Sequence, residues 1–156
     1  RTLVLDTYKH INLDKLKILS YGDDVLFSYP YELSMEDIAL AGQKYGLNIT
    51  PADKSDKFTK IDFSNATFLK RGFRMDSKHS FLVHPTFPVE EICESIRWTK
   101  NPRCMQEHVL SLCYLMWHNG KQAYEDFVSR IRSVAAGRAL YIPGYEVLAR
   151  EWYDKF

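Results

Sequence analysis

Residues 16–27 read Leu16-Lys17-Ile18-Leu19-Ser20-Tyr21-Gly22-Asp23-Asp24-Val25-Leu26-Phe27. Short apolar runs flank a Gly-Asp pair in this stretch, and such a pattern predicts a β-hairpin with a tight turn. The tip of that hairpin would carry two adjacent carboxylates, with Gly22 beside them allowing close backbone approach. Hard oxygen donors on a rigid scaffold suit Mg²⁺ and its chemistry on phosphates. Gly and Asp also dominate turns for purely local reasons, so a polar turn without a ligand is the alternative interpretation.

The wider sequence favours the first interpretation. Tyr21-Gly22-Asp23-Asp24-Val25 resembles motif C of viral RNA-dependent RNA polymerases. Five further stretches resemble segments of a picornavirus polymerase, in the same order along the chain: Thr50–Ser55, Thr67–Arg71, Glu94–Lys100, Trp117–Gly120 and Ile131–Val134. The enterovirus and rhinovirus group fits best, and within that group we expect a rhinovirus. The resemblance therefore covers essentially the whole chain.

The composition allows a packed core and excludes several classes of protein. Hydrophobic residues make up 46% and aromatic residues 14% of the 156 residues, so wholesale disorder is not expected. The net charge is only +1, so basic residues would have to act on RNA locally. The sequence has no apolar run of about eighteen residues, and it therefore predicts no membrane-spanning helix. Its three cysteines lack a CxxC pair, which argues against a disulfide framework or a zinc site.

The two ends of the sequence indicate part of a larger enzyme. Residues 1–8 read as the middle of an amphipathic helix with no capping residue before them. Residues 151–156 resemble the natural carboxyl terminus of the family. We therefore interpret the chain as the last third of a polymerase, in which the missing fingers and palm segments precede residue 1.

Local signals predict the elements of the first half. Ser34 is a candidate N-cap with an acidic residue three positions later, and Gly46 would end that helix near Tyr45. Residues 47–50 read as a strand and residues 52–60 as a polar loop. The apolar and aromatic runs 61–63, 66–73 and 81–84 predict a small antiparallel sheet.

The apolar period changes to a helical one after Pro88. Helices are predicted over 88–98, 105–118, 124–134 and 145–153, with breaks at Asn101-Pro102 and 135–137. The three tryptophans are interpreted as core aromatics: Trp98, Trp117 and Trp152. The expected fold is α+β, with a palm remnant (antiparallel sheet and helices, motifs C, D and E) over residues 1–75. A mostly α-helical thumb would follow over residues 76–156.

The resemblance assigns the two acids to metal ions. Asp23 would be the essential Mg²⁺ ligand and Asp24 a second, less strict one, with Mn²⁺ as a substitute; Tyr21 and Gly22 complete the motif. A dipeptide cannot by itself fill the octahedral shell that Mg²⁺ prefers. In the family a further aspartate comes from motif A, and motif B selects the ribose; neither motif is present. Asp56 and Asp62 are expected to be solvated loop residues.

Three basic residues receive roles by the same resemblance. Lys54 lies in the stretch matching motif D and would be the general acid that protonates the leaving pyrophosphate. Lys70 and Arg71 lie in the stretch matching motif E, the primer grip, where adjacent cations can meet successive phosphates without reading bases. From the residues alone, Lys54 could equally be an exposed loop lysine, and Lys70 and Arg71 a polar strand end.

The function that follows from the resemblance is template-directed RNA synthesis by two-metal nucleotidyl transfer, replicating a viral RNA genome. Its partners would be RNA template-primer, ribonucleoside triphosphates, the missing parts of the same polyprotein product, and other copies of the polymerase. The expected location is the host cell cytoplasm, at membrane-associated replication complexes. We expect this chain alone to be inactive, because motifs A and B and the fingers are missing. The alternative is a non-catalytic module that binds RNA or protein and has an idle Gly-Asp-Asp turn.

Overall fold

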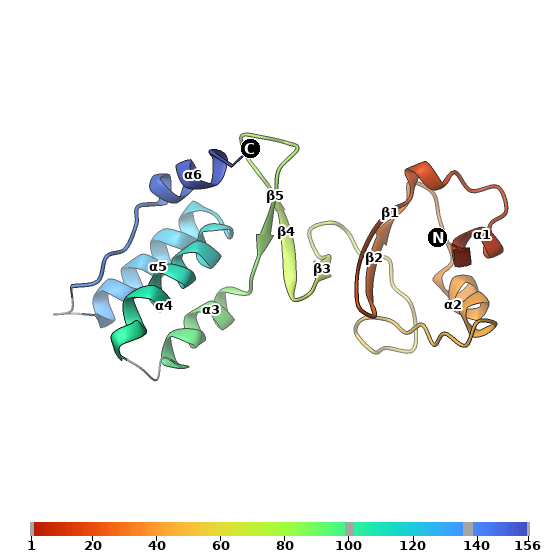
Figure 1. The fold of residues 1–156 in the computed structure, drawn as a ribbon, viewed down its shortest axis with the longest axis horizontal. Coiled ribbons are helices and arrows are strands. Elements are labelled where there is room, and N and C mark those ends of the chain that lie inside the picture. The colour runs from red at the N-terminus through yellow and green to blue at the C-terminus, as the bar shows by residue number, and fades with distance from the viewer. Residues whose placement is uncertain (1, 99–101, 136–138, 156) are drawn as a thin grey trace. The chain divides into compact units, whose positions relative to one another are not determined.

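The computed structural model of the chain describes residues 2–98, 102–135 and 139–155. The chain divides into two compact units, Arg1–Asp62 and Phe63–Phe156. Figure 1 shows helices and antiparallel strands in both, which confirms the predicted α+β class. The predicted palm and thumb boundary at 75/76 concerns roles within a larger enzyme and stays a prediction.

The predicted hairpin is present in the first unit (Figure 1). Its described elements are α1 (Thr2–Thr7), the 3₁₀ helix η1 (Leu13–Lys15), β1 (Lys17–Tyr21), β2 (Asp24–Ser28) and α2 (Met35–Gln43). Strands β1 and β2 pair antiparallel, and α1 packs against α2. The small core is built from one buried residue of α1, one that precedes β1 and one of α2: Val4, Leu16 and Ile38.

Helix α2 begins and ends as its sequence predicts. The Ser34 hydroxyl accepts a hydrogen bond from the Asp37 backbone N–H at 3.1 Å, which is the predicted N-cap. At the other end Gly46 has a φ of 73°. Its N–H donates to the Gln43 carbonyl, and the next N–H, of Leu47, donates to the Gly42 carbonyl, both at 3.0 Å. This is the Schellman pattern that a glycine after a helix allows.

Two predicted strands are absent. Residues 47–50 have no regular structure, because no described segment pairs with them and a strand needs a neighbour for its N–H and C=O groups. Ile49 instead packs against the small core and against Gly42. Residues 61–63 also form no strand, since Phe63 opens a turn and its ring lies 5.7 Å from that of Phe73.

The second unit combines the predicted small sheet with a helical part. Its antiparallel sheet has the order β3-β4-β5, formed by β3 (Thr67–Phe68), β4 (Arg71–Met75) and β5 (Val83–Thr86). The described helices are α3 (Val89–Ser95), η2 (Ile96–Trp98), η3 (Pro102–Cys104), α4 (Met105–Trp117), α5 (Lys121–Val134) and α6 (Tyr145–Tyr153). Thr99, Lys100 and Asn101 lie outside the described residues, as do Ala136 and Gly137.

The core of the second unit lies between α3, α4, α5 and α6. The apolar stripe of α4 supplies most of one side, and Trp117 at its end is almost fully buried. Trp152 packs against the same cluster, so the core assignment is confirmed for these two tryptophans. No helix in the described parts of the chain is both long and apolar enough to cross a membrane.

Trp98, which was predicted to be buried, is exposed, and so is the apolar residue at the end of α5. Trp98 is 74% exposed, because it follows the inward-facing Ile96 by two positions and so points to the other side of its turn. Val134, the last residue of α5, is 86% exposed. Ala135 packs against the core in its place, four positions after the buried Ile131.

Candidate functional site

The carboxylates lie at a two-residue turn. Tyr21 pairs with Asp24 across the hairpin, so Gly22 and Asp23 form the loop. Gly22 has a φ of 59°, and a Cβ built on it would meet nothing within 4 Å. The glycine is therefore required by the backbone of the turn and not by lack of space, since primed turns need a positive φ at this position.

Asp23 and Asp24 are adjacent and both exposed. Within the described residues, no hydrogen bond or ion pair engages either carboxylate, so their oxygens are available to a ligand. They fit part of a Mg²⁺ shell, which takes oxygen donors in octahedral order. The described residues contain no group of three or more His, Cys, Asp or Glu side chains that could hold a metal. Further donors would therefore have to come from elsewhere.

The exposed acids Asp56 and Asp62 are solvated, as predicted. Lys54 is also exposed, and its φ of 58° is uncommon for a residue with a Cβ. A local turn fixes this conformation, since the Lys54 N–H donates to the Pro51 carbonyl at 3.0 Å. No ion pair among the described residues joins Lys54 to the Gly-Asp-Asp turn.

The neighbouring Asp53 makes the loop around Lys54 more rigid. Its carboxylate accepts the Ser55 backbone N–H at 3.0 Å. This hydrogen bond is the main reason why the pKa of Asp53 lies below its ordinary value. The loop thus presents a lysine beside an ionised carboxylate.

Lys70 and Arg71 belong to different parts of the β3–β4 hairpin, because the apolar run 66–73 forms two strands with a turn between them. Phe68 pairs with Arg71, so Leu69 and Lys70 form a two-residue turn. Their φ angles are 51° and 61°, the positive values of a type I′ turn. Left-handed backbone costs a residue with a Cβ about 1–2 kcal/mol. The turn is therefore conformationally strained. Lys70 is exposed at its tip.

Arg71 opens strand β4 one residue beyond that tip. Its guanidinium lies over the ring of Phe87, 4.6 Å from the ring centre. This stacking holds the cation at the sheet surface, where it is partly exposed. The hairpin therefore presents two cations from neighbouring positions, Lys70 exposed at the turn and Arg71 stacked on Phe87.

A buried polar cluster in the second unit was not predicted. Asp76 follows β4 and is 7% exposed, and His84 in β5 is 1% exposed. One oxygen of Asp76, Oδ1, accepts the backbone N–H groups of Lys78 at 2.8 Å and His79 at 2.7 Å. The other, Oδ2, lies 2.8 Å from His84 Nε2 and accepts the Tyr153 hydroxyl at 2.5 Å.

His118, the C-cap of α4, extends this cluster. Its Nδ1 lies 3.1 Å from His84 Nδ1, and its ring packs on Trp152 with 4.7 Å between ring centres. Arg74 Nε donates to the His118 carbonyl at 2.9 Å. We name Asp76, His84, His118 and Tyr153 the polar cluster. The only local signals for it are an Asp-Ser-Lys-His turn and a histidine within an apolar strand.

Burial sets the protonation of the polar cluster. Burial alone would raise the pKa of Asp76. The hydrogen bonds from Tyr153, His84 and the backbone outweigh this effect and keep the pKa of Asp76 well below the ordinary range. Burial lowers the pKa of His84 despite its bond to Asp76. Burial, followed by the charges of His84 and Arg74, lowers the pKa of His118 to about 4. Burial and the Asp76 hydrogen bond raise the pKa of Tyr153 to about 12. At neutral pH the cluster thus holds one carboxylate and neutral partners.

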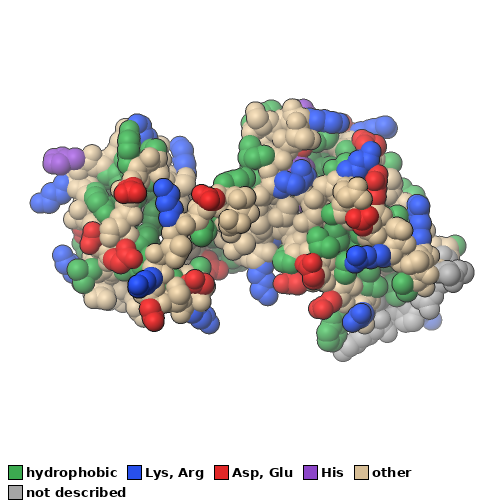
Figure 2. Space-filling model, turned by 180° about the vertical axis from the view of Figure 1, so that it is seen from behind, with side chains coloured by type: hydrophobic (Ala, Val, Ile, Leu, Met, Phe, Trp, Pro, Cys, Tyr) green, Lys and Arg blue, Asp and Glu red, His purple; other side chains and the backbone are tan. Residues whose placement is uncertain are grey.

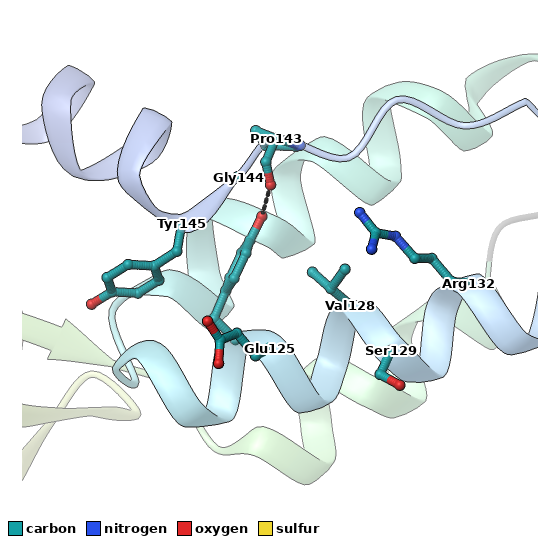
Figure 3. Close-up of a pocket in the computed structure, with 8 residues that line it drawn as sticks. Glu125, Val128, Ser129, Arg132, Pro143, Gly144 and Tyr145 are labelled. Carbon is teal, nitrogen blue, oxygen red and sulfur yellow. Dashed lines mark hydrogen bonds between the residues drawn. The ribbon is translucent and has the colours of Figure 1, made fainter.

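Neither the surface charge nor a groove in the second unit marks another site. Figure 2 shows basic side chains interspersed with acidic ones over the visible face. A groove of about 350 Å³ lies between α5 and residues 143–145, where the Tyr124 hydroxyl donates to the Pro143 carbonyl at 2.5 Å (Figure 3). None of its lining residues is a predicted site residue.

Comparisons with known proteins bear on the family. The family model described as "Viral RNA-dependent RNA polymerase" matches residues 3–136. The chain is 72% identical over all 156 residues to the genome polyproteins of Human rhinovirus 1A and Human rhinovirus 16, and 57% identical to that of Porcine enterovirus 9. It spans 7% of the length of each polyprotein.

A solved structure gives the same result for the fold. The Sicinivirus 3Dpol RNA dependent RNA polymerase matches 97% of this chain with a TM-score of 0.75 and 29% sequence identity. The chain corresponds to 33% of that polymerase. The family match, the full-length identity to rhinovirus polyproteins and the shared fold agree with the resemblance at the Gly-Asp-Asp turn. The chain belongs to the viral RNA-dependent RNA polymerase family.

Proposed function

We propose that this chain supplies the Gly-Asp-Asp turn and a second hairpin to a picornaviral polymerase. The second hairpin, formed by β3 and β4 with Lys70 and Arg71, is named the RNA-contacting hairpin. That polymerase would join ribonucleoside triphosphates to a primer 3′-hydroxyl, directed by an RNA template. The observation that carries the proposal is an exposed two-residue turn with adjacent, unengaged carboxylates in a chain of this family.

Asp23 and Asp24 would hold Mg²⁺, with Mn²⁺ as a substitute. Bound divalent ions supply charge neutralisation on the attacking and leaving oxygens of phosphoryl transfer. The role of the chain is to keep two carboxylates side by side on a rigid hairpin, with Gly22 leaving room for a nucleotide to approach. The remaining metal donors would come from segments outside this chain, because the described residues supply no third one.

Lys54 would act as the general acid. A lysine beside a phosphate can give a proton to a leaving pyrophosphate oxygen. The exposed position of Lys54, held by a turn at Pro51, suits a group that must reach a substrate.

Lys70 and Arg71 would contact the RNA backbone. Contacts from cations to phosphates position a strand without reading its sequence. Arg71 is held by its stacking on Phe87, while Lys70 projects from the turn. The two residues would thus meet neighbouring phosphates from different points of one hairpin.

The further parts of the proposal concern the complete enzyme. Its partners would include template-primer RNA, the fingers and remaining palm segments of the same polyprotein product, and other polymerase copies. It would act in the host cell cytoplasm at membrane-associated replication complexes. The isolated chain is expected to give no templated product in a radiolabelled nucleotide-incorporation assay, and clear product from it would overturn that expectation.

A Mn²⁺ titration of the complete polymerase, followed by electron paramagnetic resonance, tests the metal assignment. Asp23→Asn removes one charge from the turn and should abolish a Mn²⁺ site. Asp56→Asn, which also neutralises an exposed acid, is the matched control and should leave that site intact. Unchanged Mn²⁺ binding in Asp23→Asn would favour the alternative, a binding module with an idle turn.

A further inference from the structure

The polar cluster joins the RNA-contacting hairpin to the helices of the second unit. Its members come from four places in the chain. Asp76 follows β4, His84 lies in β5, His118 caps α4, and Tyr153 ends α6. In Figure 1 the end of α6 lies near the loop that connects β4 and β5. The cluster is therefore the point where the sheet, α4 and α6 are hydrogen-bonded to one another.

The ionised Asp76 carboxylate lets us assign a direction to each hydrogen bond in the cluster. An ionised carboxylate only accepts, so the proton of neutral His84 lies on Nε2, facing Asp76. His84 Nδ1 is then an acceptor, and the proton of His118 lies on Nδ1. A single chain of donors thus runs from His118 through His84 to Asp76. Any shift of β5 against α4 would leave a buried donor or acceptor unpaired.

Strand β4 transmits this anchoring to the RNA-contacting hairpin. Arg74 pairs with His84 across the sheet and also donates to the His118 carbonyl. Arg71 lies three residues earlier in the same strand, about 10 Å away at the usual rise of a strand. Between them, Gly72 lies so close to Thr86 that an added Cβ would be 2.6 Å from its Oγ1. The strand is thus closely paired between the anchor and Arg71.

We propose that the polar cluster positions Lys70 and Arg71 for RNA by fixing β4 and β5 on α4 and α6. The proposal rests on the proposed function, in which these two cations contact the RNA backbone. Apolar packing alone is non-directional, whereas a buried hydrogen-bond chain permits one arrangement. A buried polar group adds little net stability over an apolar one of similar size, so its contribution here is the geometry that it specifies. The cluster residues are positioning residues and do not touch RNA.

The test uses the complete polymerase and a primer-template RNA. His118→Phe keeps an aromatic ring against Trp152 but removes the donor to His84. It should weaken RNA binding by about tenfold while leaving the nucleotide KM of preassembled complexes within about twofold, since affinity changes and nucleotide turnover report different contacts. Tyr114→Phe removes another hydrogen bond between α4 and α6, to Glu151, and is the matched control. It should not change RNA affinity.

A double-mutant cycle separates positioning from general destabilisation. In a background that combines Lys70→Ala with Arg71→Ala, His118→Phe should cause less than about a twofold further loss of RNA affinity, because both residues that it positions are already absent. An undiminished tenfold loss in that background would overturn the proposal, and so would unchanged RNA affinity in His118→Phe. Tyr153→Phe removes a single donor to Asp76 and gives a second, milder variant should His118→Phe fail to fold. Unchanged RNA affinity in a folded Tyr153→Phe would then overturn the proposal.

The outcomes also distinguish this inference from the proposed function. If Arg71→Ala weakens RNA binding and His118→Phe does not, only the positioning role is wrong. If an active polymerase tolerates Lys70→Ala combined with Arg71→Ala without loss of RNA affinity, the RNA-contacting role of the hairpin is wrong, and the positioning role falls with it.

Discussion

Removing the Asp76 carboxylate should destabilise the second unit strongly. In the Asp76→Ala variant the Tyr153 hydroxyl and His84 Nε2, both held by Oδ2, lose their acceptor. A buried donor left unpaired costs about 1–3 kcal/mol. The N–H groups of Lys78 and His79 lie beside exposed or partly exposed side chains, and water can replace the lost acceptor there. We therefore expect the free energy of unfolding of the second unit to fall by about 2–6 kcal/mol, set by the two donors that lose Oδ2.

Asp76→Asn should be milder. Its remaining oxygen can still accept the two backbone N–H groups at the turn. His84 can change tautomer so that Nε2 accepts a hydrogen bond from the new amide. The Tyr153 hydroxyl can rotate to accept in the same way. A loss of about 1–2 kcal/mol is expected, near that of a single hydrogen bond.

Hydrogen exchange of the complete polymerase measures both losses locally. Peptides from α4 and α6 report the opening of the second unit without unfolding the rest of the enzyme. Each 1.4 kcal/mol accelerates exchange about tenfold, so Asp76→Ala should increase it by about 30-fold or more. Exchange within about threefold of the unchanged protein, or an asparagine variant that exchanges faster than the alanine variant, would refute the reasoning.

Three further perturbations follow from the fold. Because the pKa of His118 is about 4 in the folded state, below its ordinary value of 6.5, and that of His84 is also lowered, the folded state binds fewer protons. The stability of the second unit should then fall by up to about 3 kcal/mol as pH drops from 6.5 towards 4. Hydrogen exchange in α4 measures this fall, after correction for the intrinsic exchange rate. An exchange rate that does not vary with pH would contradict the prediction. Gly72→Ala should lower the free energy of unfolding by about 1–3 kcal/mol, because the added Cβ would clash with Thr86 Oγ1. In a thermal melt, adding Thr86→Ala should restore part of this stability. An equal loss with and without Thr86 would rule out the clash. Ser34→Ala should lower the free energy of opening of α2 by about 1 kcal/mol, because it removes the N-cap. Hydrogen exchange in α2 should then be faster, and an unchanged exchange rate would contradict this.

Elements with a strong local signal were predictable from the sequence. The hairpin at residues 16–27 combines apolar runs with a glycine that the turn geometry needs. The helices of the second unit carry apolar residues at the helical period, and Ser34 and Gly46 mark the ends of α2 through capping chemistry. In these cases the residues that determine the structure are close together in the sequence.

Features that depend on distant partners were not predictable. Residues 47–50 have strand-forming residues, but strand formation requires a partner that the described chain does not provide. The turn at Leu69 and Lys70 contains no Asn or Gly, the residues that usually mark type I′ geometry, so its position was not predicted. Asp76 and Tyr153 are 77 residues apart, and no local pattern connects them. The polar cluster is a consequence of tertiary packing.

Templated nucleotide incorporation by the complete polymerase tests the central claim most directly. Asp23→Asn should reduce the incorporation rate by at least about 100-fold with either Mg²⁺ or Mn²⁺, because metal-held charge stabilisation contributes several kcal/mol to phosphoryl transfer. RNA affinity should be unchanged, and Asp56→Asn should incorporate at the normal rate. An Asp23→Asn enzyme that incorporates nucleotides at a rate close to that of Asp56→Asn would contradict a catalytic role for the Gly-Asp-Asp turn.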